Sequence, residues 1–163
     1  MSMTVLMALK KIKQLGRKID KTKERIARWC SYLEEEAPPL YTDIPGMIQS
    51  VNDMLAMQAQ LKHLIHKTNM LTQIEFRGKS YTIDELLLAR TVTLPAERNA
   101  LKVLRRKERD NYNYGRNRDE APGKVINQYD PKWRDQQVDD IDYMLEEIDN
   151  VLDMFNMSTN LVN

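Results

Sequence analysis

The sequence predicts an all-α protein: an elongated antiparallel four-helix bundle of coiled-coil type, with one small β-hairpin between the second and third helices. Two observations lead to this prediction. Apolar residues recur every three or four positions along most of the 163-residue chain, which is the period of an amphipathic helix. Only residues 73–82 alternate instead, around an Arg-Gly pair, as two strands joined by a tight turn do. We expect a single domain over residues 1–163.

The first helix is expected over residues 4–36. Its heptad seam consists of Val5, Ala8, Ile12, Leu15, Ile19, Thr22, Ile26, Trp29 and Leu33. Such a seam faces a partner helix in a coiled coil, so Ile19 is a predicted core residue. Pro38 and Pro39 then end the helix, because proline cannot continue the backbone hydrogen-bond ladder.

The second helix is expected over residues 44–70, with Asp43 before it and Pro45 in its first turn. Its seam runs through Met47, Val51, Met54, Gln58, Leu61, Ile65 and Thr68. Gln58 and Thr68 make this seam polar at two positions.

The hairpin is expected at residues 73–82, where "QIEF" and "KSYTI" flank Arg77 and Gly78. Gly78 is a structural residue here, because glycine takes the positive φ that a tight turn demands. The alternating apolar side chains, with Phe76, Arg77 and Tyr81 near the turn, suit contact with a partner protein. Two roles stay open: a rigid corner between helices, or an edge that a neighbouring strand extends.

The third helix is expected over residues 83–109. "TIDE" matches a capping box, with Thr82 as N-cap and Glu85 three residues later. Pro95 should kink or restart this helix, and Thr93 is then its local cap.

A polar loop over residues 110–130 separates this helix from the last one. Arginine and tyrosine are common in protein interfaces and also hold phosphates and stack on bases. The predicted partner-binding residues in and beside this loop are Arg109, Tyr112, Tyr114, Arg116, Arg118 and Tyr129. Because the chain has a net charge of only +1, protein contact is favoured over nucleic acid.

The last helix is expected over residues 131–157, after Asp130 as cap. Its apolar stripe consists of Val138, Ile141, Leu145, Ile148, Leu152 and Phe155, and Ile148 near the middle is a predicted core residue. Residues 131–163 carry a charge of −6, from two basic and eight acidic residues, whereas residues 1–29 carry +7, from nine basic and two acidic residues. These opposite charges either pair within the bundle or, if they are exposed, favour head-to-tail association of copies.

The sequence gives little indication of a metal site or a catalytic site. His63 and His66 are one helical turn apart, but no third metal ligand is evident nearby. The one cysteine, Cys30, has no base beside it in the sequence. With no phosphate-binding loop and no catalytic triad motif, we expect a non-enzymatic protein without a metal or other cofactor. The N-terminal apolar run is too short to span a membrane and lacks the charge order of a signal peptide, so no membrane partner is expected.

Two segments resemble the septicolysin-like family of small helical bacterial and phage proteins. They are "HKTNMLTQIEFRGKSYTIDELLLARTVTLPAERNALKVLRR" and "IDNVLDMFNMSTNLV", and the matching positions are Lys67, Thr68, Asn69, Arg77, Gly78, Thr82, Asn156, Thr159 and Leu161. The resemblance implies the same helix–hairpin–helix order and an origin in a bacterium or phage. Pro95 and the loop depart from the pattern, and the resemblance adds no mechanism.

From the seams, the missing catalytic cluster and the resemblance, we expect a structural or assembly protein. Its expected setting is a phage virion, after synthesis in the host cytoplasm, where it binds capsid or tail proteins and self-associates. The alternative is a helical nucleic-acid-binding or regulatory module in the bacterial cytoplasm, which uses the loop over 110–130.

Overall fold

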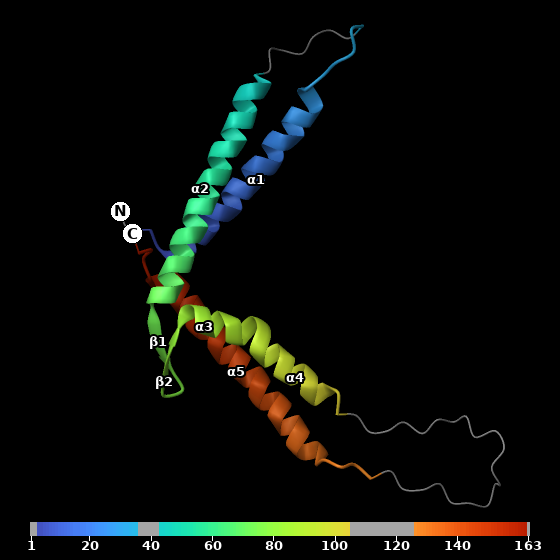
Figure 1. The fold of residues 1–163 in the computed structure, drawn as a ribbon, viewed down its shortest axis with the longest axis vertical. Coiled ribbons are helices and arrows are strands. Elements are labelled where there is room, and N and C mark those ends of the chain that lie inside the picture. Colours follow the sequence, from blue (N-terminus) through green and yellow to red (C-terminus); the bar gives the residue numbers. More distant parts are fainter. Residues whose placement is uncertain (1–2, 36–42, 105–125, 163) are drawn as a thin grey trace, which may run out of the picture. The chain divides into compact units, whose positions relative to one another are not determined.

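The computed structural model describes residues 3–35, 43–104 and 126–162. Within them the elements follow the order of Figure 1: α1 (Val5–Trp29), α2 (Ile44–Leu71), β1 (Gln73–Phe76), β2 (Lys79–Thr82), α3 (Ile83–Leu88), the π-helical turn η1 (Ala89–Thr93), α4 (Leu94–Lys102) and α5 (Pro131–Ser158). The all-α fold and the hairpin between the second and third predicted helices are therefore confirmed. The chain divides into two compact units, a first unit of residues 1–84 and 152–163 and a second unit of residues 85–151.

In the first unit, α1 and α2 lie side by side (Figure 1) and pack along the predicted seam. Ala8, Leu15 and Leu61 form a buried cluster. The half-buried residues against this cluster are Ile12, Met54, Ile65 and, from the C-terminal segment, Leu161. Ile19 is also buried, so its core position is confirmed.

The first helix is shorter than predicted, because α1 ends at Trp29 rather than at residue 36. The seam loses its partner at this end: the Trp29 side chain is 42% exposed and that of Leu33 is 68% exposed. Further helical turns would therefore bury little apolar surface, and burial of an apolar face is the main source of helix stability in proteins.

The polar seam position Gln58 is explained by a contact between α1 and α2. Its side-chain Nε2 donates to the backbone carbonyl of Ile12, at 2.9 Å. Gly16 lies beneath this amide, and a Cβ built on it would be 3.5 Å from Nε2. A Cβ at this position would thus be in ordinary van der Waals contact with the amide, and the half-buried Gln58 side chain gains a partner on the backbone of α1.

The hairpin has the predicted position and turn. Its strands pair antiparallel, from Gln73 opposite Thr82 to Phe76 opposite Lys79. Arg77 and Gly78 have φ angles of 51° and 74°. Two consecutive positive φ values in a two-residue loop define a type I′ turn, whose twist matches that of the strands.

Replacing Gly78 with Ala is expected to lower the free energy of unfolding by about 1–2 kcal/mol, because a Cβ is strained at positive φ. No neighbouring atom lies within 4 Å of that Cβ position, so the cost is conformational. Urea denaturation followed by circular dichroism measures it. The exposed Lys79→Ala substitution is the control, and equal stability of the two variants would contradict the argument.

The third predicted helix is interrupted where Pro95 occurs. Pro95 has no amide hydrogen, and the backbone accommodates it through η1, in which the amide of Leu94 bonds to the carbonyl of Ala89, five residues back. The predicted interruption of this helix by Pro95 is therefore observed, but α4 ends at Lys102, earlier than the predicted bound of residue 109. Thr93 is helical and makes no side-chain capping bond, so its predicted capping role is wrong.

The second unit contains most of α5, and two ion pairs join this helix to the third-helix region. Arg90 of η1 pairs with Asp149, and Arg98 of α4 pairs with Asp142 at 2.7 Å. The buried apolar residues of this unit are Leu86, Leu94, Ile141 and Ile148. The predicted core position of Ile148 is confirmed.

Candidate functional site

The hairpin is attached rigidly to the end of α2. The amide and the hydroxyl of Thr72 both donate to the carbonyl of Thr68, at 3.0 and 2.9 Å. The Thr72 carbonyl in turn accepts from the amide of Ile83, at 3.2 Å, one position beyond the last strand pair. The strand ladder therefore connects α2 to α3 without an intervening flexible loop.

Both ends of the described chain brace this attachment. Thr4 and Asn160 form an antiparallel bridge. Beside it, the amide of Val5 donates to the carbonyl of Thr159, and the amide of Leu161 to the carbonyl of Met3, each at 2.9 Å. We call this set of backbone contacts, together with Thr68 and Val162, the terminal clamp.

Thr68 is the centre of the terminal clamp and is fully buried. Its hydroxyl donates to the carbonyl of Leu64 at 2.7 Å and accepts from the amide of Val162 at 3.0 Å. The second polar seam position is thus satisfied by residues at the far end of the chain. Thr68, Thr159 and Leu161, three of the positions that carried the family resemblance, all belong to this clamp.

The predicted partner-binding residues of the hairpin do lie together. The rings of Phe76 and Tyr81 are 6.4 Å apart in an edge-to-face arrangement, and the Arg77 guanidinium lies 5.7 Å from the Phe76 ring centre. Ile74 is directly opposite Tyr81. Ile74, Phe76 and Tyr81 are half-buried rather than fully displayed, while Arg77 is exposed.

The hairpin also has an open edge. Because Phe76 and Lys79 close the turn, the hydrogen-bonded pairs of the ladder are Phe76 with Lys79 and Ile74 with Tyr81. Gln73 and Glu75 alternate with these hydrogen-bonded positions on β1, so their backbone N–H and C=O groups point away from β2. In the described part of the chain the sheet has two strands, and β2 is the strand that packs against α2. Within the described residues no third strand pairs with the outer side of β1.

The structural residues predicted for the hairpin and the next helix are placed as follows. Thr82 directly precedes Ile83, the first residue of α3, which is the N-cap position. Glu85 is exposed in the first turn. The capping bonds of Thr82 and Glu85 stay a prediction.

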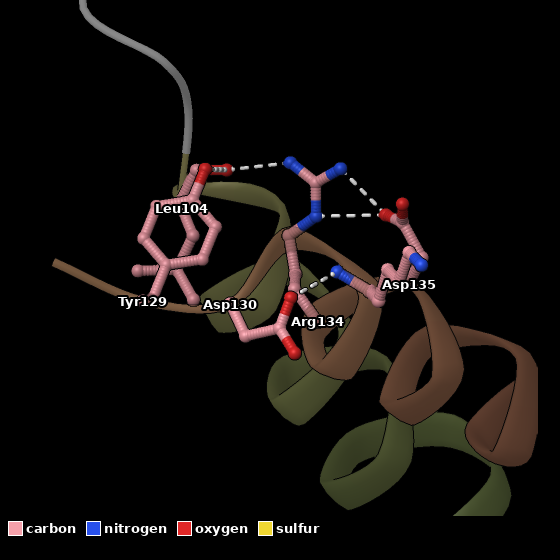
Figure 2. Close-up of polar contacts among 6 residues, drawn as sticks. Leu104, Tyr129, Asp130, Arg134 and Asp135 are labelled. Carbon is pink, nitrogen blue, oxygen red and sulfur yellow. Dashed lines mark hydrogen bonds and ion pairs between the residues drawn. The ribbon is translucent and has the colours of Figure 1, made fainter. Parts of the chain in front are cut away.

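A second polar cluster closes the helix pair of the second unit (Figure 2). The carbonyl of Leu104 accepts from the Tyr129 hydroxyl at 3.0 Å and from Arg134 Nη1 at 2.8 Å. The Arg134 guanidinium lies 6.0 Å from the Tyr129 ring centre, and its hydrogen bond to Asp135 raises its pKa above the usual value. Two donors thus stabilise a carbonyl just beyond the end of α4.

This cluster changes the interpretation of the predicted loop. Tyr129 belongs to a closing contact, and Asp130 caps α5 as predicted, accepting from the amide of Lys132 at 2.9 Å. Sequence reasoning missed Arg134. Its position one helical turn after the cap residue Asp130 is the feature of the sequence that could have indicated its role at this end of α5. The other predicted loop residues lie outside the described residues: Arg109, Tyr112, Tyr114, Arg116 and Arg118.

The described residues were also compared with the requirements of a metal site and of a membrane-spanning helix. Residues 3–35, 43–104 and 126–162 contain no group of three His, Cys, Asp or Glu side chains close enough to hold a metal ion. His63 and His66 are exposed, and His66 instead lies 3.6 Å from Asp84. Over the same residues, none of the helices combines the length and apolar character needed to cross a bilayer.

Comparison with known proteins gives one match. The model of a family described as a family of unknown function, DUF6847, matches residues 13–161. No curated protein and no solved structure showed significant similarity to the chain. The matched range begins within α1 and includes all later helices and both strands, so the family model covers the hairpin and, of the terminal clamp, Thr68 and residues 159–161.

Proposed function

We propose that this chain, which belongs to the DUF6847 family, is a non-enzymatic assembly protein that binds another protein through its β-hairpin. The open edge of β1 is the single observation that carries this proposal. In the part of the chain that the structure describes, no further strand pairs with the outward backbone groups of Gln73 and Glu75, which are hydrogen-bonding positions of the kind that an added strand satisfies.

The hairpin's attachment supports the same proposal. A two-stranded hairpin is marginally stable by itself, yet this one is joined by backbone bonds to α2 and braced through Thr68. A rigid edge loses little conformational entropy on binding, which favours affinity. The half-buried Phe76 and Tyr81 rings offer apolar contact to the partner.

The Glu75→Pro variant is expected to lose partner binding while the fold is retained. Proline removes the outward amide hydrogen of Glu75, and that amide takes no part in the bonds to β2. Glu75→Ala is the matched control, because it removes the same side chain and keeps the amide. The measurement is the fraction of tagged protein that sediments with large assemblies from its native source, with circular dichroism as the check on folding.

Loss of co-sedimentation by the proline variant alone supports strand addition. If both variants co-sediment like the unmodified protein, the edge of β1 is not the docking site.

We further propose that the assembly is a phage particle, where the partners are capsid or tail proteins. The family resemblance noted in the sequence supports this setting. Mass spectrometry of purified virions is the direct test, and it is expected to detect the protein at a fixed ratio to a capsid protein. Detection in host cells together with absence from virions would contradict the proposal.

The nucleic-acid alternative rests on the loop over 110–130. Of its predicted residues the structure describes Tyr129, whose hydroxyl already bonds to the Leu104 carbonyl. A base-stacking role for this ring would have to break that contact. Binding to DNA or RNA that weakens steeply as salt is raised would favour the alternative.

A further inference from the structure

The outer surface of α1 carries a continuous set of unpaired cations. All nine of its basic residues are exposed, and none of their side chains has a hydrogen bond or ion pair within the part of the chain that the structure describes. Lys10, Arg17, Lys21 and Arg28 follow one side of this helix. We call these four residues the basic stripe.

The acidic residues of α5 are only partly used within the chain. Asp142 and Asp149 pair with Arg98 and Arg90, and Asp135 pairs with its neighbour Arg134. Pairing of the two oppositely charged helices inside the bundle was one of the two roles that the sequence left open. The described ion pairs instead join the acidic residues of α5 to arginines of η1, α4 and α5 itself.

A remaining set of α5 carboxylates is exposed and has no partner in the described residues. Asp139, Glu146 and Asp153 follow one side of the helix at intervals of seven residues. We call these three residues the acidic stripe. Residues seven apart on an α-helix lie on nearly the same side, about 10.5 Å from one another along the axis.

The two stripes match in spacing and in length. Lys10 and Arg17, and likewise Lys21 and Arg28, are also seven residues apart. The basic stripe extends about 27 Å along its helix and the acidic stripe about 21 Å. Two helices placed side by side would therefore bring two of the three carboxylates level with a cation and leave the third about 4.5 Å along the axis from the nearest one, within reach of a long basic side chain.

We propose that the basic stripe of one copy binds the acidic stripe of a second copy, so that the protein assembles head to tail. The surfaces are different patches of the same chain, so the contact is heterologous and leads to a ring or an open filament. This goes beyond the proposed hairpin function, and it uses no residue of the hairpin.

Charge complementarity favours a second copy over a polyanion. The two terminal segments carry charges of +7 and −6 and nearly cancel in the net charge of +1. A nucleic acid would be attracted to the basic stripe alone, whereas a second copy satisfies both stripes. Because each exposed ion pair contributes little, the association is expected to weaken strongly with salt.

The experiment uses two full-length triple variants. The first reverses the basic stripe with Lys10→Glu, Arg17→Glu and Lys21→Glu. The second reverses the acidic stripe with Asp139→Lys, Glu146→Lys and Asp153→Lys. Circular dichroism confirms that each remains helical, as expected for exposed positions. Sedimentation velocity then follows self-association over a range of concentrations at about 0.05 M and about 0.5 M salt.

The unmodified protein is expected to associate at low salt in a concentration-dependent way. Each triple variant is expected to raise the apparent dissociation constant at least about tenfold. An equimolar mixture of the two variants should restore association, because each reversed stripe then meets its complement. A control variant with Lys10→Arg and Lys21→Arg should associate like the unmodified protein.

Three outcomes would overturn the proposal. The first is an unmodified protein that stays monomeric at low salt and high concentration. The second is a mixture of helical variants that fails to associate. The third concerns DNA. If the unmodified protein binds DNA, the basic-stripe variant does not, and mixing the two variants fails to restore association, the basic stripe of α1 binds nucleic acid instead.

Discussion

Replacing Ile148 with Ala is expected to lower the free energy of unfolding by about 2–5 kcal/mol. Its side chain is 1% exposed, at the centre of the apolar side of α5. The substitution removes buried apolar contacts and leaves a cavity that the neighbouring helices fill only in part. Urea denaturation followed by circular dichroism measures the loss. Asn150→Ala, an exposed position on the same helix, is the control and should change stability by less than about 0.5 kcal/mol.

The same substitution at Ile19 tests the first unit in the same way. Ile19 is 4% exposed, and a loss of about 2–5 kcal/mol is again expected. Ile19 belongs to the first compact unit and Ile148 to the second. The single domain predicted from the sequence requires both variants to shift one common unfolding transition. Two separate transitions, each moved by one variant, would contradict it, and a loss below about 0.5 kcal/mol would mean that the seam is not a core.

Replacing Thr68 with Val is expected to lower the free energy of unfolding by about 1–3 kcal/mol. The shape of the side chain is nearly unchanged, but the amide of Val162 loses the acceptor that the hydroxyl of the fully buried Thr68 provides in a part-buried hydrogen bond. An amide that loses its partner costs free energy to the extent that water does not replace the bond. The loss should appear in urea denaturation, together with faster amide hydrogen exchange at Val162 and Leu161.

Thr91→Val is a matched control for this prediction. The Thr91 hydroxyl also donates to a carbonyl four residues earlier, that of Leu87 at 2.7 Å, but the residue is exposed and accepts no bond from a distant segment. Its substitution should change stability by less than about 0.5 kcal/mol. Thr68→Ser should keep most of the stability, because it retains the hydroxyl. Equal effects of Thr68→Val and Thr91→Val would show that the terminal clamp contributes nothing.

Features with a local physical cause could be predicted from the sequence. Heptad spacing placed Ile19 and Ile148 in cores, because a helix turns with a period that the chain itself displays. Arg77 and Gly78 predicted the turn, since few residues tolerate two successive positive φ angles. Pro95 predicted an interruption, although not its form, because the missing amide hydrogen can be accommodated by a kink, a new cap or a π-helical turn.

The candidate site could be predicted in part for the same reason. Phe76, Arg77 and Tyr81 lie on two strands joined by a two-residue turn, so their proximity follows from the local register. The open edge of β1 did not follow, because it depends on which strand packs against α2.

Only the tertiary structure decided the contacts between residues far apart in the chain. Thr68 and Val162 are 94 positions apart, and nothing in the periodicity of either segment specifies that the hydroxyl of one accepts the amide of the other. The same holds for Tyr129 and Arg134, which meet the Leu104 carbonyl across 25 and 30 positions. Arg90 and Arg98 likewise engage Asp149 and Asp142, and among the described residues no ion pair involves a cation of α1. Hydrogen bonds and ion pairs need atoms within about 3 to 4 Å, so they are determined by the packing of helices, whereas the helices themselves follow from the order of the residues.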